Sequence, residues 1–540
     1  MAASISDKAA AAEHTSRYRY GYVRSPDQDA RPAARHPVIV VGAGPVGLTA
    51  AIDLALRRIP VVLLDDADRI GTGSRGICWS KRTLEIWDRL GVGERMVAHG
   101  VTWKLGKVFL GDAQVYSFDL LPEDGHKMPA FINLQQYFVE HALIDRVAEI
   151  DRIDLRWRNK VVALVPRNDG VRLTVDTPEG RYDLDADWVI AADGARSAVR
   201  GMLGLGFTGV TFEDKFLIAD VRMAADFPTE RRFWFDPPFH SGQSALMHKQ
   251  PDCWRIDLQL GPDADSEEEQ KPERVMPRLT KMFGDRALEL EWVSIYQFNC
   301  RRLDRFIHGR VIFIGDAAHQ VSPFGARGAN SGVQDAENLA WKLAAVLGGQ
   351  ADAALIESYN RERTQAADEN IAHSTRSTDF IAPHSPAERR LRNAVLALAP
   401  VAEFARRMVN SGRLSTATIY DTPLSTPDET TFAGSAELGA PAPDAPMRGR
   451  GGRQGYLLEW LRGDFCVLHV MNGARPTVPA GVNLFVVGDD IHDDSGVFTW
   501  RFDATPGATY VVRPDQHLAA RFRDFDCAKV MRAIGRAKGA

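Results

Sequence analysis

The chain has 540 residues, of which 45% are hydrophobic and 25% charged, and its net charge is −5 at pH 7. This length allows about three domains. The slightly acidic balance, without a basic run, argues against a nucleic-acid-binding protein. The five cysteines form no Cys-x-x-Cys pair, which argues against a zinc ribbon and fits a reducing, cytoplasmic compartment. No apolar run reaches about 18 residues, so we expect no membrane span, and no cluster of metal ligands is visible.

The N-terminal region divides into a tail and a first folded unit. Residues 1–36 are rich in Ala, Arg, Asp and Ser and lack the apolar core of a secretion signal, so we predict a flexible tail. The apolar run Val38–Val41, a helical pattern over about 47–58 and a second apolar run, Val61–Leu64, follow. Short apolar strands on both sides of a helix predict a βαβ unit with a parallel sheet.

Two further apolar strands lie much later in the chain, at Trp188–Ala192 and Val311–Ile314. They predict that one domain is assembled from residues 37–206 and 301–385. Between these segments, residues 207–300 contain short strand-like stretches broken by Pro, Gly and charged residues, which favours an inserted, mostly antiparallel sheet.

The C-terminal part begins after a helical region. We expect residues 386–438 to form a helical connector that ends in a linker, because Pro and Gly are concentrated at 439–452. Residues 439–540 then predict a separate domain with several strands and a final helix.

A Gly-rich turn joins the first strand to the first helix, with the sequence Gly42-Ala-Gly44-Pro45-Val46-Gly47. Glycines at this spacing allow a tight turn, a close approach of backbone to a pyrophosphate and close packing of the helix on the sheet. The helix N-terminus adds free N–H groups for the phosphates. Asp65, at the end of the next strand, is placed to accept hydrogen bonds from ribose hydroxyls. The turn therefore predicts dinucleotide binding.

A second Gly-x-Gly-x-x-Gly match spans 71–76 but follows no strand directly, so a plain loop is the better interpretation. Arg75 within it is kept as a candidate phosphate contact.

Two more motifs follow the later strands. Asp193-Gly194-Ala-Arg196 comes after the strand at 188–192, and Gly315-Asp316-Ala-Ala-His319 comes after the strand at 311–314. The second continues into a Gly-rich segment that opens a helix and contains Pro323, Gly325, Gly328, Ala329 and Asn330. Parallel strands deliver such residues to the carboxyl edge of the sheet, where ligands bind in open α/β folds.

These three motifs, in this order, resemble those of the group A flavoprotein aromatic hydroxylases, which include para-hydroxybenzoate hydroxylase, phenol hydroxylase and 3-(3-hydroxyphenyl)propionate hydroxylase. The resemblance covers about residues 38–370. It implies an enzyme that binds FAD, uses NADPH or NADH and O2, and hydroxylates a phenol-like aromatic molecule through a flavin C4a-hydroperoxide.

The resemblance also implies roles for single residues. Asp316 and Gln136 would contact the ribityl chain of FAD, the backbone of Ala329 and Asn330 would contact the flavin pyrimidine edge, and Asp193 with Arg196 would serve both FAD and NAD(P)H. The candidate cofactor-binding residues are therefore Gly42, Gly44, Pro45, Val46, Gly47, Asp65, Arg75, Gln136, Asp193, Gly194, Arg196, Gly315, Asp316, Pro323, Gly325, Gly328, Ala329 and Asn330.

The overall prediction is an α/β fold, α+β when taken as a whole. It has a Rossmann-like FAD-binding domain, an inserted antiparallel substrate sheet, a helical region and a C-terminal domain. That last domain resembles the thioredoxin-like domain of phenol hydroxylase relatives, and without Cys-x-x-Cys it is expected to be redox-silent.

The substrate side of the site is less defined by the sequence. His240 and His248 lie in the predicted inserted sheet and are candidates for the base that helps a phenol ionise, although a surface or core histidine is the more ordinary interpretation of each. His319 is expected to be part of a structural turn. The stripe Phe233-Trp234-Phe235 fits an aromatic pocket and core packing equally well.

Alternative functions stay open at this point. A flavin-dependent halogenase or prenyl-chain reductase, or a flavin-binding protein without catalytic activity, would also carry the nucleotide motifs. The expected partners are an aromatic small molecule and O2, without nucleic acid or membrane, and a homodimer is left open.

Overall fold

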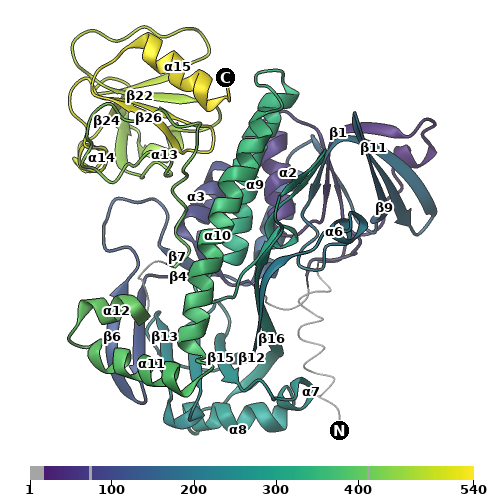
Figure 1. Ribbon diagram of the computed structural model, residues 1–540, viewed down its shortest axis with the longest axis vertical. Coiled ribbons are helices and arrows are strands. Elements are labelled where there is room, and N and C mark those ends of the chain that lie inside the picture. Colours follow the sequence, from purple (N-terminus) through teal and green to yellow (C-terminus); the bar gives the residue numbers. More distant parts are fainter. Residues whose placement is uncertain (1–17, 72–75, 410–413) are drawn as a thin grey trace.

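The computed structural model describes residues 18–71, 76–409 and 414–540. Three parts lie around the long helices α9 (Gly328–Leu347) and α10 (Leu355–Ile381): a domain with a parallel sheet, a second large sheet and a separate C-terminal domain (Figure 1). The predicted α/β class is confirmed by this combination of parallel and antiparallel sheets.

The first domain is organised by five parallel strands, in which the apolar runs 38–41, 61–64 and 188–191 are buried. In spatial order they are β18 (Val311–Phe313), β11 (Gly180–Ala191), β1 (Ala34–Val41), β2 (Val61–Leu64) and β8 (Ile153–Arg156). The short β17 (Ile307–His308) and the hairpin β9 (Lys160–Arg167) and β10 (Gly170–Thr177) add antiparallel strands. Each predicted apolar run therefore became a buried strand, because a strand covered on both faces needs apolar side chains throughout.

Helix α2 (Pro45–Leu56) crosses from β1 to β2 and packs against both α9 and α5 (Gln136–Ala148). Its small residues Ala50, Ala51 and Ala55 are buried, which lets these helices approach closely. The order β1–α2–β2 confirms the predicted βαβ unit.

Residues 18–36 do not form the flexible tail that we predicted. Tyr20 stacks on Trp157 with ring centroids 4.6 Å apart, and Asp27 accepts a hydrogen bond of 2.5 Å from Arg156. The short helix η1 (Pro26–Asp29) is capped by Ser25. Trp157 and Arg156 lie more than a hundred residues away from their partners in this segment, so composition alone gave no signal for these contacts.

The second sheet has eight strands and is antiparallel except where β13 meets β5. In spatial order they are β19 (His319–Gln320), β16 (Glu289–Arg302), β12 (Thr208–Arg222), β15 (Trp254–Leu260), β14 (Ser244–Lys249), β13 (Arg231–Phe235), β5 (Leu105–Leu110) and β6 (Ala113–Asp119). The sheet is thus wider than the predicted 207–300, since β5, β6 and β19 come from segments assigned to the first domain.

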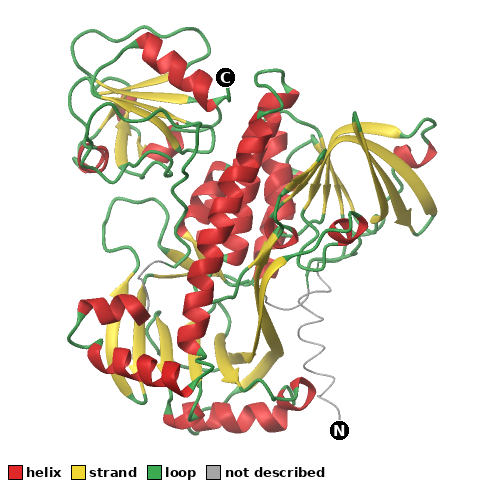
Figure 2. Ribbon diagram, viewed as in Figure 1, coloured by secondary structure: helices red, strands yellow, loops and turns green. Residues whose placement is uncertain are grey.

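The two faces of this sheet have different covers. On one face, Leu217, Met247 and Ile256 form a core with Val275 and Leu279 of α8 (Pro272–Phe283). On the other face, a cluster with Val108, Phe216 and Phe235 includes residues of α11 (Pro386–Leu398) and α12 (Glu403–Val409). Figure 2 shows these helices beside the lower sheet. The predicted connector is therefore in part a cover for the inserted sheet.

Smaller elements complete the first two parts. A three-stranded sheet is formed by β3 (Cys78–Ser80), β7 (Phe131–Asn133) and β4 (Val101–Trp103). The remaining helices there are α3 (Lys81–Arg89), α4 (Gly93–His99), α6 (Ala198–Met202) and α7 (Ser266–Glu269), with the 3-10 turns η2 (Pro238–His240) and η3 (Gly315–Ala317).

The C-terminal domain has its own seven-stranded sheet and its own core. Its strands, in spatial order, are β21 (Gln454–Tyr456), β20 (Pro446–Gly449), β24 (Ile491–His492), β23 (Asn483–Val487), β22 (Cys466–Val470), β25 (Thr509–Val512) and β26 (Leu518–Phe522). Its helical segments are η4 (Arg450–Gly452), α13 (Leu457–Trp460), α14 (Val497–Phe502) and α15 (Cys527–Ala537). Leu424 and Ala436 already pack into it, upstream of the predicted start at 439. Its thioredoxin-like character stays a prediction.

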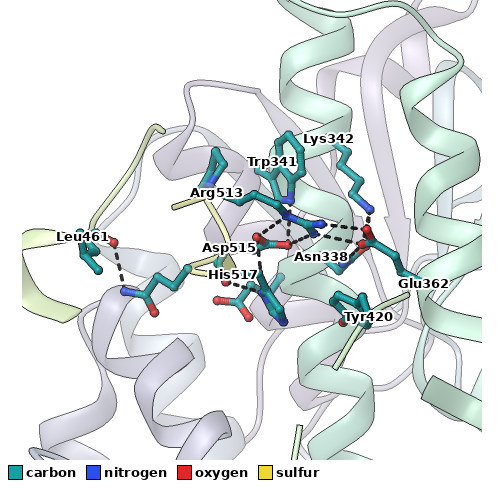
Figure 3. A network of polar contacts seen from close by, with 12 residues as sticks. Asn338, Trp341, Lys342, Glu362, Tyr420, Leu461, Arg513, Asp515 and His517 are labelled. Carbon is teal, nitrogen blue, oxygen red and sulfur yellow. Dashed lines mark hydrogen bonds and ion pairs between the residues drawn. The ribbon is translucent and has the colours of Figure 1, made fainter. Parts of the chain in front are cut away.

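A buried charge network, shown in Figure 3, fastens this domain to α9 and α10. Arg513 donates to Glu362 at 2.8 Å, Lys342 donates to the same carboxylate at 2.7 Å, and Trp341 donates to Asp515 at 3.0 Å. Since Glu362 and Lys342 are fully buried, these charges can be kept only because each has an opposite partner.

Within the described residues, no helix combines the length and apolar character needed to cross a bilayer. The same part of the chain contains no group of three or more His, Cys, Asp or Glu side chains able to hold a metal ion.

Candidate active site

The Gly-rich turn between β1 and α2 is packed tightly on one side and open on the other. A Cβ on Gly42, whose φ is +105°, would lie 2.5 Å from the carbonyl oxygen of Ala192, and one on Gly47 would lie 1.9 Å from the Gly42 oxygen. A Cβ on Gly44, by contrast, would meet no atom of the described residues within 4 Å, and none of their side chains caps the start of α2. The first N–H groups of this helix are therefore available to a pyrophosphate.

Asp65 follows β2 and holds the turn itself. Its carboxylate accepts hydrogen bonds from the backbone N–H groups of Ala43, at 2.6 Å, and Ala67, at 2.9 Å. Burial raises the pKa of Asp65. The predicted contact with a ribose would have to use the remaining lone pairs of the same carboxylate.

Asp193 follows β11 on the neighbouring strand. One carboxylate oxygen accepts a hydrogen bond from the Val199 N–H at 3.0 Å, while Oδ1 is buried and has no partner in the described part of the chain. Burial raises the pKa of this carboxyl. Gly194 takes a φ of +74°, so the turn suits glycine. Arg196, two residues after Gly194, is exposed, and its predicted role stays a prediction.

The third motif follows β18 and meets the first. Val46 at the start of α2 lies against Gly315 and Gly332, and a Cβ on Gly332 would stand 2.7 Å from Val46 Cγ2. Asp316 directly follows Gly315 and is exposed at this edge. The starts of α2 and α9 thus converge at the carboxyl ends of β1, β11 and β18.

His319 is structural, as expected. It is buried and its Nε2 lies 2.7 Å from Asp335 Oδ2, the oxygen that also accepts the Gly315 N–H at 2.9 Å. Arg363 donates to the other oxygen of Asp335 at 2.5 Å. The histidine therefore braces the Gly315 turn.

Asn330, in the first turn of α9, uses its whole side chain to hold neighbouring segments. Its Oδ1 accepts hydrogen bonds from the Ser80 N–H and the Thr83 hydroxyl, and its Nδ2 donates to the carbonyls of Cys78 and Ala326. The backbone of Gly328, Ala329 and Asn330 is thereby fixed in place, with the turn Pro323–Gly325 just before it. A rigid, uncapped helix start of this kind can stabilise negative charge on a ligand.

Gln136 braces the loop whose centre, including Arg75, lies outside the described residues. Its Oε1 accepts the Gly76 N–H at 3.1 Å, and its Nε2 donates to Glu140 at 2.7 Å. Glu140 in turn accepts the Gly71 N–H at 2.9 Å. Gln136 therefore positions both ends of the segment that carries Arg75.

The two candidate histidines occupy different places. His240 in η2 lies 2.6 Å from the Gln259 carbonyl and close to the charges of α8, on the face of the second sheet that α8 covers. This place gives no support to a role on the substrate. His248 in β14 is 3% exposed, with its Nδ1 unpartnered in the described part of the chain. Burial, together with nearby Arg231 and Arg255, lowers its pKa well below the usual range, so the imidazole is neutral.

A cavity lies between the second sheet and the Gly-rich loop before α9. Its empty space, together with the solvent-filled opening, amounts to about 540 Å³. Its lining residues are Lys107, Val108, Phe118, Arg231, Phe233, Phe235, Phe324, Gly325, Ser377, Ile381, Val409 and Leu414.

The aromatic stripe at residues 233–235 contributes side chains to both the cavity and the core. Phe233 and Phe235 line the cavity, whereas Trp234 stacks on Phe109 in the core on the opposite face. Alternation along a strand explains this split. Arg231 occupies the same alternating positions of β13 as Phe233 and Phe235, and it lines the cavity with them. This alternation is the signal that sequence reasoning overlooked.

Comparison with known proteins gives the family. The family model described as an FAD binding domain matches residues 35–374. The chain belongs to this family. FAD is therefore its cofactor, and the tight Gly42 turn, the open α2 start and the unpartnered Asp193 oxygen form a cradle that fits it.

Relatives of this FAD-binding protein are monooxygenases. It is 29% identical over 510 residues to a flavin-dependent monooxygenase of Mycobacteroides abscessus, covering 89% of this chain and 96% of the relative. It is 33% identical to 6-methylpretetramide 4-monooxygenase of Streptomyces rimosus, covering 68% and 64%. The fold matches the crystal structure of the flavin-dependent monooxygenase PieE in complex with FAD and substrate, with a TM-score of 0.76, 23% identity and coverage of 93% and 98%. The protein is an FAD-dependent oxidoreductase of this monooxygenase group.

Proposed function

We propose that the protein hydroxylates a phenolic aromatic molecule, with NADPH or NADH as electron donor and O2 as the source of the new oxygen. The observation that carries this proposal is the meeting of three cofactor motifs at one sheet edge, beside a cavity lined by four phenylalanines. The names of the relatives, which act on aromatic substrates such as 3-hydroxyphenylpropionate, support the same chemistry.

The residues assigned to FAD have distinct tasks in this proposal. The start of α2 would hold the pyrophosphate, Asp65 the adenosine ribose, and Gln136 with Asp316 the ribityl chain. The backbone at Ala329 and Asn330 would hold the pyrimidine part of the flavin. Once bound and reduced, FAD supplies the activation of O2.

The side chains of the cavity would position the substrate and limit its contact with water. Phe233, Phe235 and Phe324 would hold a flat ring in the cavity and shield the bound ring from water. Gly325, with a φ of +105°, also lines the cavity, so the loop that leads into α9 forms one wall. A substrate in the cavity would therefore lie next to the segment assigned to the flavin.

The overall reaction consumes one NAD(P)H, one proton and one O2 for each aromatic C–H converted to C–OH, and releases NAD(P)+ and water. Purified protein should carry FAD, and a panel of mono- and bicyclic phenols should stimulate NAD(P)H oxidation. A product whose mass rises by one oxygen derived from 18O2 establishes hydroxylation. Lack of stimulation by any phenol, with FAD bound, would instead favour a halogenase, a reductase or a flavin-binding protein without catalytic activity.

A cytoplasmic location and a homodimer remain predictions.

A further inference from the structure

One cation in the cavity wall has no partner among the residues that the structure describes. Arg231 is 9% exposed and lines the cavity, and it makes no side-chain hydrogen bond or ion pair with any described residue. The other charged residue of the lining, Lys107, is paired with Glu230 at 2.9 Å. Glu230 also pairs with Arg232 at 2.8 Å. The nearby acid, Glu230, therefore pairs with the two neighbours of Arg231 and forms no ion pair with Arg231 itself.

The other described groups around Arg231 form no ion pair with it either. The register of the sheet places Arg231 on the same face as His248, which is neutral, and close to Arg255. Arg255 already has its own carboxylate, since it donates twice to Asp220 at 2.8 Å. Asp257 acts on Arg231 through space, but no ion pair joins them. Burial lowers the pKa of Arg231, and the charge of Asp257 only partly opposes this effect.

A buried guanidinium without an ion-pair partner destabilises a protein. Its position in a cavity wall is therefore explained if an anionic ligand binds there. A guanidinium fits planar oxyanions best, because two parallel N–H groups can bind both oxygens of a carboxylate. The surroundings define the rest of the ligand: Phe233 and Phe235, with ring centroids 4.8 Å apart, and Phe118 and Phe324 suit a flat aromatic body.

We propose that Arg231 binds an oxyanion of the aromatic substrate, so that the enzyme acts on phenolic acids or on phenols with a second, ionised enol or hydroxyl group. This inference rests on the proposed function, since it takes the cavity to be the substrate site. Arg231 is a specificity-determining residue in this scheme, and it anchors the end of the molecule that does not react.

Binding to the oxidised, FAD-containing enzyme tests the inference without any turnover. Three bicyclic probes are titrated at pH 7.5, with the flavin absorbance change or equilibrium dialysis as readout: 2-naphthol, which is neutral, 6-hydroxy-2-naphthoate, which carries a carboxylate, and 2-hydroxy-1,4-naphthoquinone, whose enol is ionised. Wild-type protein should bind at least one anionic probe about tenfold or more tightly than 2-naphthol, in line with a charge-assisted hydrogen bond. Which anion is preferred distinguishes a carboxylate from an enolate substrate.

The variants separate this role from a structural one. R231Q should lose the preference for anions, R231K should keep part of it, and K107Q, which removes the paired cation of the same cavity, should keep it fully. R231Q should retain FAD and unfold at the same or a higher temperature, because no contact is lost. Equal binding of all probes by the wild type, an unchanged preference in R231Q, or loss of FAD from R231Q would overturn the proposal. Hydroxylation of phenols without such a preference would leave the proposed function intact.

Discussion

Removal of the Glu362 carboxylate should destabilise the junction between the C-terminal domain and α10. The carboxylate is fully buried and accepts hydrogen bonds from Arg513, Lys342 and Asn338 at 2.7–3.0 Å. Burial alone would raise its pKa, but the adjacent Arg513 and Lys342 cations hold it below the usual range. E362Q keeps the shape and leaves one positive charge in excess, and breaking a buried pair in this way costs about 3–5 kcal/mol.

Denaturant unfolding followed by tryptophan fluorescence measures this loss, because Trp341 lies in the network, 5.3 Å from the Arg513 guanidinium. The matched control is E357Q on the same helix, whose exposed pair with Arg305 is worth less than about 1 kcal/mol. The double variant K342M/E362M restores charge balance and should be milder than E362Q. If E362Q unfolds within about 1 kcal/mol of E357Q, the network does not hold the domain.

Three further changes test the cofactor site and the inner face of the sheet. G47A should weaken FAD binding at least tenfold, because its Cβ would meet the Gly42 oxygen at 1.9 Å, whereas G201A, with open space around it, should not. D316A should lose FAD while keeping its circular dichroism spectrum, and a fully flavinated variant would refute that role. Burial raises the pKa of Asp257 from 3.8 to about 6. A raised pKa favours folding below pH 4, and this contribution fades as pH rises through 6, so wild type should lose about 3 kcal/mol relative to D257N over that interval. A difference in unfolding free energy between wild type and D257N that does not change with pH would contradict this prediction.

The cofactor side of the site was predictable because its signals are local. An apolar run followed by Gly42, Gly44 and Gly47 defines strand, turn and helix within a few residues, and the structure places them as β1 and α2. The turns after β11 and β18 could be found in the same way. Only parallel pairing in one sheet was needed to bring them to a common edge.

The substrate side depends on pairings that sequence does not encode locally. Strand β5 joins β13, from which it is separated by more than a hundred residues, and thereby brings Val108 into the cavity wall. Phe233 and Trp234 are equally hydrophobic, yet only the register decided which one faces the cavity. The predicted role of His240 was unsupported for the same reason, because the covering helix α8 could not be placed in advance.

Among the described residues, buried charges are paired where they maintain the fold and unpaired where we propose that a ligand binds. At the domain junction, Glu362 and Arg513 have short contacts to opposite charges. On the cavity face of the second sheet, Arg231 has no such contact, and the Oδ1 atom of Asp257 is buried without a hydrogen bond in the described part of the chain. Unsatisfied polar groups of this kind cost stability and are expected where binding requires them. The same physical rule that makes the junction rigid therefore identifies the sheet face beside the flavin site as the place where substrate specificity is set.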